Sequence, residues 1–141
     1  MLHKTFKDLK GRISANPNIK SVQWFNAQYD GTIHLDPAVF IEFPGLINVT
    51  PVTTAYASAE IPIKLHVATS LVSEQEGGAP EYAIAEHDAL VAWIVLQLKG
   101  QKIAFKGDSF SLEFKGFQYY QLHRGWLITF LNFSLPVGML K

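Results

Sequence analysis

Two spacings of apolar residues recur along the 141-residue chain, and each predicts a different kind of element. Near the start, apolar residues separated by four, three and four positions predict one face of a short helix. They are Leu2, Phe6, Leu9 and Ile13. A second helix is predicted over residues 80–98, because Pro80 suits a first helical position and Lys99-Gly100 suits a helix end.

Elsewhere, stretches that are rich in β-forming residues or that divide into two alternating rows of side chains predict strands. The segments with this pattern are residues 19–28, 37–43, 60–69, 110–119 and 126–133. In the third segment, Leu65 belongs to the apolar row and His66 to the opposite row, which we expect to form the wetter face. Pro62 predicts a strand start or sheet edge in that segment, and Gly116 predicts a bulge in the fourth.

The predicted elements follow one another in the order α-β-β-β-α-β-β. This order predicts an α+β fold in which two helices pack on a mostly antiparallel sheet of about five strands. The length fits a single domain, residues 1–141, with its own core. The last strand is apolar on both faces, so we expect it to lie centrally in the sheet.

Composition narrows the possible functions. Only 17% of the residues are charged, 48% are hydrophobic, and the formal net charge is zero. Such a chain lacks the excess of positive charge that is typical of proteins that bind nucleic acid directly. A protein without net charge tends to associate with other proteins. Because it has no cysteine, disulfides and thiolate sites are excluded. We expect no signal peptide, since MLHKTFKDLKG has no apolar core, and no membrane span, since the apolar run at 89–98 is too short.

Residues 45–59 carry no charge, although a solvated loop of that length normally holds charged residues. The segment is a candidate for a flexible arm or for a loop covered by a partner, and an ordinary Thr/Ala/Ser loop is the plainer interpretation. Glu74 and Glu76 lie in a loop without the spaced aspartates of a calcium site, and they offer either a solvated loop or a contact with a basic partner. The candidate interface residues are Leu46, Ile47, Val49, Val52, Tyr56, Glu74, Gln75 and Glu76.

Glu86-His87-Asp88 is the stretch most suggestive of chemistry, but its spacing argues against a joint site. Consecutive helical residues point about 100° apart, so three neighbours cannot converge on one metal ion or one substrate atom. Three and four positions from His87 there are only apolar residues: Ala83, Ile84, Leu90 and Val91. We therefore interpret His87 as part of a solvated helix face, and expect no catalytic, cofactor-binding or metal-binding residues.

The other histidines are scattered over separate elements. They are His3, His34, His66 and His123. No nucleophile motif, phosphate loop or dinucleotide fingerprint accompanies them, so an enzyme that uses His66 or His123 ranks last. The aromatic content of 13% keeps another alternative open, a small-molecule-binding α+β domain with an aromatic-lined pocket.

Nearly the whole chain resembles the tail-terminator, or tail-completion, proteins of long-tailed phages and their prophages. The likeness lies in the order of the elements and in five stretches rather than in an invariant motif. These stretches are SVQWF at 21–25, PAVFIEFPG at 37–45, IPIKLHVAT at 61–69, EYAIAEHDALVAWIVLQLKG at 81–100 and RGWLITFLNFSLPV at 124–137.

The resemblance implies a non-enzymatic virion protein that works without cofactors. Such proteins form a ring, commonly a hexamer, that caps the tail tube and joins it to the head. The implied partners are further copies of the chain, the tail-tube protein and the head–tail connector protein. The implied location is the virion tail, and the host cytoplasm during assembly. Low charge and uncharged segments suit the contacts of such a ring.

Overall fold

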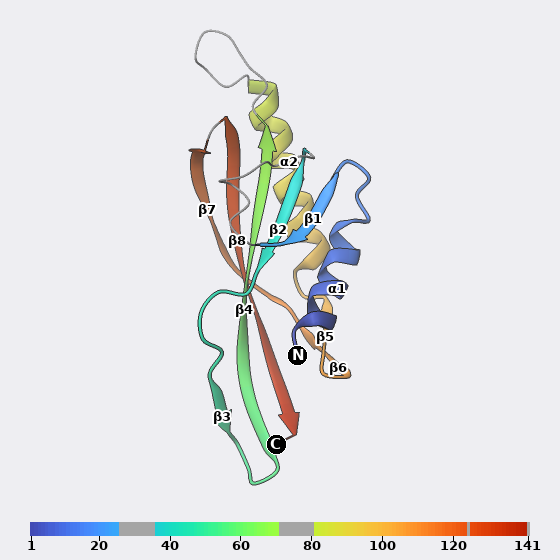
Figure 1. Ribbon diagram of the computed structural model, residues 1–141, viewed down its shortest axis with the longest axis vertical. Coiled ribbons are helices and arrows are strands. Elements are labelled where there is room, and N and C mark those ends of the chain that lie inside the picture. Colours follow the sequence, from blue (N-terminus) through green and yellow to red (C-terminus); the bar gives the residue numbers. More distant parts are fainter. Residues whose placement is uncertain (26–35, 71–80, 124, 141) are drawn as a thin grey trace.

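The structure is a computed structural model that describes residues 1–25, 36–70, 81–123 and 125–140. Within these residues it contains two helices and eight strands (Figure 1). They are α1 (His3–Ile13), β1 (Ser21–Trp24), β2 (Ala38–Glu42), β3 (Val49–Pro51), β4 (Tyr56–Ser70), α2 (Glu81–Leu98), β5 (Lys102–Phe105), β6 (Asp108–Ser111), β7 (Glu113–His123) and β8 (Trp126–Leu140).

Six of these strands form one sheet, in the order β1-β2-β4-β8-β7 with β3 also paired to β4. β5 and β6 form a separate hairpin. β1 and β2 are parallel, and the other described pairs are antiparallel. The predicted α+β class, with two helices on a mostly antiparallel sheet, is therefore confirmed, and β8 lies inside the sheet as expected.

The sheet is built around β4 and β8, which have 15 residues each and pair along their whole length. The ladder runs from Tyr56 opposite Leu140 to Ser70 opposite Trp126. One half is flanked by β2 and β7, whereas the other half extends towards the end of the molecule with β3 beside it (Figure 1). Pro62 lies between the stretches of β4 that pair with β3 and with β2, so its missing N–H falls at a local sheet edge, as predicted.

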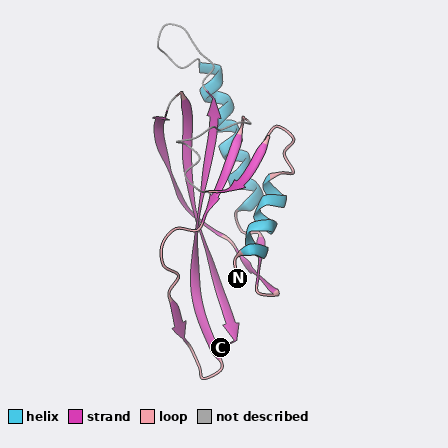
Figure 2. Ribbon diagram, viewed as in Figure 1, coloured by secondary structure: helices cyan, strands magenta, loops and turns pink. Residues whose placement is uncertain are grey.

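The main core lies between the sheet and the two helices, which cover the same face (Figure 2). β4 contributes the predicted apolar row, and its members are Ile61, Ile63, Leu65 and Val67. α2 contributes a stripe at helical spacing that consists of Ala83, His87, Leu90, Ile94 and Leu98. A smaller cluster lies on the opposite face and consists of Ala38, Phe40, Ala68 and Ile128. This second cluster is the reason that the predicted wetter face of β4 is wrong near His66.

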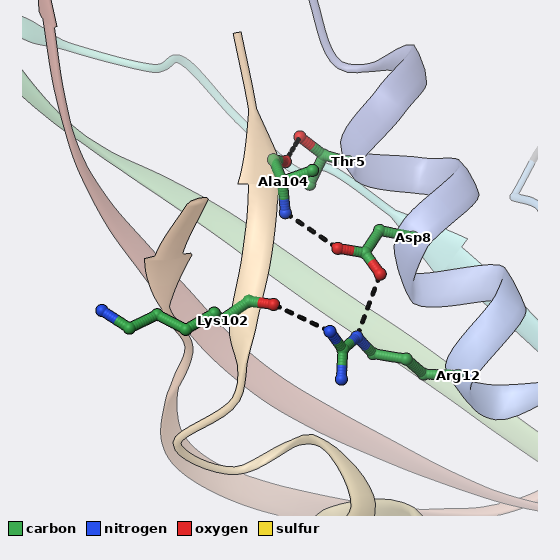
Figure 3. Close-up of polar contacts among 5 residues, drawn as sticks. All are labelled: Thr5, Asp8, Arg12, Lys102 and Ala104. Carbon is green, nitrogen blue, oxygen red and sulfur yellow. Dashed lines mark hydrogen bonds and ion pairs between the residues drawn. The ribbon is translucent and has the colours of Figure 1, made fainter. Parts of the chain in front are cut away.

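Three polar side chains of α1 bind β5 and fix the β5–β6 hairpin to the helix (Figure 3). Thr5 donates its hydroxyl to the Ala104 carbonyl at 2.6 Å, and Asp8 Oδ2 accepts the Ala104 N–H at 2.9 Å. Arg12 donates to Asp8 Oδ1 at 3.0 Å and to the Lys102 carbonyl at 2.9 Å. Positions 5, 8 and 12 are three and four residues apart, so they share one helix face. They satisfy backbone groups of β5 that a neighbouring strand would otherwise bond.

Replacing Asp8 with alanine should lower the free energy of unfolding by about 1–3 kcal/mol, because the Ala104 N–H and the Arg12 guanidinium lose their acceptor. Urea denaturation at neutral pH measures the loss. Asp108→Ala is the matched control, because Asp108 is exposed and accepts only a local bond from the Ser109 N–H in the described structure, so we expect a change within about 0.5 kcal/mol. Equal losses in the two variants would contradict this role of Asp8.

The boundaries of several elements differ from the prediction. The strand expected at 19–28 is β1 within the described residues, and positions 26–28 lie outside them. Residues 45–59 contain β3 and the start of β4, which were expected as a loop or an arm. The strand expected at 110–119 is divided between β6 and β7, and the hairpin of β5 and β6 was not predicted. The bulge at Gly116 is confirmed, since the pairing register with β8 shifts between Phe114 and Gly116.

Candidate functional site

One end of the molecule is an arm made of β3, the first half of β4 and the last part of β8 (Figure 1). We define the arm as residues 44–63 and 133–140. Glu60 is the one charged residue in these two segments of the sequence, and its carboxylate accepts a hydrogen bond from the Ser134 hydroxyl at 2.8 Å. Exposed strand edges are commonly protected by charged side chains. The arm lacks this protection, which favours contact with another chain.

The tip of the arm is a hydrogen-bonded turn between β3 and β4. The N–H groups of Val52 and Thr53 donate to the Tyr56 carbonyl at 2.9 and 3.0 Å. The Thr53 hydroxyl accepts the N–H groups of Ala55 and Tyr56 at 3.2 and 3.0 Å. Threonine hydroxyls stabilise turns through local bonds of this kind. The tip is therefore a defined hairpin that can present side chains in a fixed arrangement.

Large apolar side chains are exposed on this arm. The described structure has eleven exposed large hydrophobic residues, and five of them lie on the arm. They are Leu46, Val49, Val52, Tyr56 and Leu140. Leu46 has the largest exposed fraction, 80%. Such a concentration on one projection is typical of a surface that contacts another protein.

The structure places the predicted interface residues in three different ways. Four are exposed together on the arm: Leu46, Val49, Val52 and Tyr56. Ile47 is partly buried and packs against the main core. Glu74, Gln75 and Glu76 lie outside the described residues. Leu140 was missed, although its place at the end of an uncharged strand was a usable signal. That these residues form an interface stays a prediction.

A groove of about 930 Å³ runs beside the arm. Its lining includes Pro44 and Leu46 from the segment before β3, and Pro62 and Pro136 from β4 and β8. Along residues 60–63, β4 has no described strand partner on the side of β2 and β3. A strand edge without a neighbouring strand, beside an open groove, can bind an extended segment of another chain. The arm thus combines exposed apolar side chains with a place for a neighbouring chain.

A second hollow, of about 610 Å³, lies between the first half of α2 and the ends of β2 and β4. His87 lines it and is fully buried. Its Nδ1 atom is 2.8 Å from the Thr69 hydroxyl, and its Nε2 atom is 2.8 Å from the Thr129 hydroxyl. A neutral imidazole has one donor and one acceptor nitrogen, and hydroxyl groups can complement both. Burial lowers the pKa of His87 to about 4, while Asp88 acts in the opposite direction.

The interpretation of His87 as part of a solvated helix face is therefore wrong. Its position in the stripe of Ala83, Leu90 and Ile94 was the signal that predicts burial. Glu86 and Asp88 are exposed, so the three consecutive side chains point in different directions, as the helical spacing indicated. Both ring nitrogens of His87 are within hydrogen-bond distance of threonine hydroxyls, and these contacts join α2 to β4 and β8.

His66 is also buried, with 3% of its surface exposed, and not on a wet face. Its ring stacks on Phe25 with centroids 4.2 Å apart and meets the ring of Phe130 edge-on at 4.7 Å. Its Nε2 atom is 2.6 Å from a carboxylate oxygen of Glu42. Burial lowers the pKa of His66, and the bond to Glu42 opposes this change. His66 is buried beside the second cluster, whereas Glu42 is partly exposed, and the contact between them joins β2 to β4.

Among the described residues, the other histidines form no candidate catalytic or metal-binding site. His3 is exposed on α1, while His34 and the side chain of His123 lie outside the described part. No three or more His, Asp or Glu side chains among the described residues are placed to hold a metal ion. In the same part of the chain, no helix has the length and hydrophobicity required to cross a membrane.

Comparison with known proteins gives a match in structure but not in sequence. No protein-family model and no curated protein matches the chain. Among solved structures, a chain from the virion of a native gene transfer agent particle has the same fold, with a TM-score of 0.67 and 15% sequence identity. The match covers 95% of this chain and 94% of that chain. At this identity the likeness concerns the fold, and this α+β fold is therefore one that a gene transfer agent virion contains.

Proposed function

We propose that this protein is a structural component of a phage-like virion and acts as a tail terminator. In this role, copies of the chain form a ring, with six as the expected number, that caps the tail tube and joins it to the head. The observation that carries the proposal is the fold shared over nearly the whole chain with a chain of a gene transfer agent virion. The exposed apolar side chains of the arm supply a surface for the contacts that such a ring needs.

Subunits of a ring meet through two different patches, so that each copy binds the next one in the same sense. A projecting arm suits this geometry because it can reach across a subunit boundary. Burial of its apolar side chains removes them from water, which stabilises the assembly by about 25 cal/mol for each Å² buried. Low charge at the centre of the contact is typical of protein interfaces.

The proposed partners are further copies of the chain, the tail-tube protein and the head–tail connector protein. The proposed location is the virion tail, and the host cytoplasm before assembly is complete. We propose no catalytic step. The two buried histidines support this view, since His87 is held by two threonines and His66 by Glu42.

A small-molecule-binding domain, the alternative from the sequence, finds less support. The hollow beside His87 has the volume of a ligand site. Its described lining has two aromatic residues, Tyr82 and Trp93, and is polar over much of the rest. The polar lining includes Asn16, Asn18, Lys20, Asp36, Ser70 and Glu86. This lining differs from the aromatic-lined pocket that the sequence suggested, so the structural role is preferred.

Light scattering coupled to size-exclusion chromatography tests the proposal, with and without purified tail-tube protein. We expect a discrete closed oligomer. The double variant Leu46→Ser/Val52→Ser should weaken each subunit contact by about tenfold or more, because it removes two exposed apolar side chains from the arm. Leu96→Ser is the matched control, since Leu96 is 77% exposed but lies on α2, and it should assemble as the unmodified protein does.

Two outcomes would contradict the proposal. The first is an unmodified protein that remains monomeric at high concentration and does not assemble on the tail-tube protein. The second is an arm variant that assembles as well as the Leu96→Ser control. Thermal melting of each variant shows whether a lost assembly reflects lost folding, and exposed positions should change stability by no more than about 0.5 kcal/mol.

A further inference from the structure

The zero net charge of the chain hides a strong separation of charges. Residues 1–12 and 99–108 hold seven Lys and Arg and two Asp. We call the exposed lysines of these segments the basic surface, and they are Lys4, Lys7, Lys10, Lys99, Lys102 and Lys106. By contrast, α2 holds Glu81, Glu86 and Asp88 in its first half and has neither Lys nor Arg. These two groups of charges therefore belong to different parts of the fold, although Lys20 also lines the hollow that Glu86 borders.

The basic surface is held together by the contacts between α1 and β5 (Figure 3). Ala104 bonds to both Thr5 and Asp8, so the helix and the hairpin present their lysines from one fixed unit. The Asp8 carboxylate accepts one bond from Ala104 and one from Arg12 within that unit. Asp108 is the one exposed carboxylate of these two segments. The unit therefore presents a clear excess of positive charge to its surroundings.

The stability of α1 accounts for Lys10 but not for Lys4 and Lys7. Lys10 lies in the last turn, where the helix dipole favours a cation, and its Nζ atom is 5.9 Å from the centre of the Phe6 ring. Lys4 lies in the first turn, where the helix dipole disfavours cations, and that turn has no acidic residue. Leu2 at the N-cap makes no side-chain bond to the helix. Lys4 and Lys7 are exposed and have no such stabilising role in α1, so their charges are better explained by binding to something acidic.

The chain itself carries a suitable acidic counterpart. Glu81, Glu86 and Asp88 are exposed, and Asp88 is held by a 2.7 Å bond from the Tyr119 hydroxyl. They lie in the half of α2 that is remote from α1 and the β5–β6 hairpin (Figure 1). A helix of 18 residues is about 27 Å long, so the two groups of charges are beyond each other's screening distance within one molecule. They can meet only between molecules.

We propose that the basic surface of one copy binds the acidic first half of α2 of a second copy. This inference rests on the proposed ring and names a contact within the assembly that differs from the arm. The contact is head-to-tail, because two different surfaces meet. Complementary charge speeds the encounter and sets its orientation, whereas the uncharged arm supplies the apolar area.

Charge reversal tests the contact in the full chain. K4E/K7E/K10E and E81K/E86K should each lower the apparent association constant by about tenfold or more, measured by sedimentation velocity. An equal mixture of the two variants should restore assembly, because each basic surface then meets an acidic one in alternating copies. Raising NaCl from about 50 mM to about 500 mM should also weaken association of the unmodified protein. The helix dipole favours K4E in the first turn of α1 and disfavours K10E in the last turn, so the triple variant should melt close to the unmodified protein, which thermal melting checks.

Each outcome decides between the two proposals. If the unmodified protein assembles and neither reversal changes its association, the charge contact is wrong and the ring proposal stands. If the unmodified protein does not assemble even with the tail-tube protein, both are wrong. If K4E/K7E/K10E assembles as the unmodified protein does but no longer binds a duplex DNA probe, the basic surface binds nucleic acid. That result overturns the proposed contact. The contact is supported if the mixture of the two variants assembles while each variant by itself does not.

Discussion

Lowering the pH from 7 to 4 is expected to remove about 3 kcal/mol from the free energy of unfolding through His87 alone. The pKa of His87 is about 4 in the folded protein, below its ordinary value of 6.5. Between these two values the unfolded chain binds a proton that the folded protein does not bind, so stability falls as the pH falls. The cause is burial, since a charged imidazole between Thr69 and Thr129 would lose its hydration.

Urea denaturation at a series of pH values, compared between the unmodified protein and His87→Gln, isolates this contribution. The variant should be less stable at pH 7 and should show a smaller loss between pH 7 and pH 4. Other groups, His66 among them, titrate in both proteins and cancel in the comparison. His3→Gln is the matched control, because it makes the same substitution at an exposed histidine of α1. Parallel curves for the unmodified protein and His87→Gln would contradict the role of His87.

Replacing Leu65 with alanine should lower the free energy of unfolding by about 3–4 kcal/mol. Leu65 is fully buried in β4, with Ile41 of β2 opposite it on one side and Leu131 of β8 on the other. The loss combines the transfer of apolar atoms with the cavity that they leave, and a position enclosed by two strands and the helices cannot easily collapse.

The same substitution at an exposed leucine gives the matched comparison. Leu96 is 77% exposed on α2, and Leu96→Ala should change the free energy of unfolding by no more than about 0.5 kcal/mol. Urea denaturation of both variants at neutral pH provides the measurement. A loss below about 1 kcal/mol for Leu65→Ala would mean that β4 is not at the centre of the core.

The sequence predicts the helices and the main strands well because each of them has one face of regularly spaced apolar residues. The row that contains Leu65 alternates with polar neighbours, and α1 repeats at intervals of three and four. Prediction failed where burial depends on distant parts of the chain. His66 follows the polar row of its strand, yet Phe40, Ala68 and Ile128 form a second cluster on that face. A single strand does not indicate that its other face will also be covered.

The candidate surfaces were predictable to different degrees. The lack of charge over residues 45–59 led us to expect a contact surface, which stays a prediction, and it did not indicate the hairpin of β3 and β4. The β5–β6 hairpin was missed because its strands have four residues each, but Lys106 and Gly107 have positive φ angles at its turn, and Lys-Gly was a weak signal for it. The basic surface was missed because its two segments lie far apart in the sequence and contact each other only in the fold.

The pairing of β4 with β8 also bears on how the protein folds. α2 and the strands β5, β6 and β7 lie between these two partners in the sequence, so the central ladder is a set of contacts with high contact order. Folding that depends on such distant pairing is slow, because the closure of a long loop precedes the gain from the contacts. During synthesis, β4 leaves the ribosome well before β8, with its apolar row uncovered. We expect the time before β8 arrives to be the period in which this chain is most prone to aggregate.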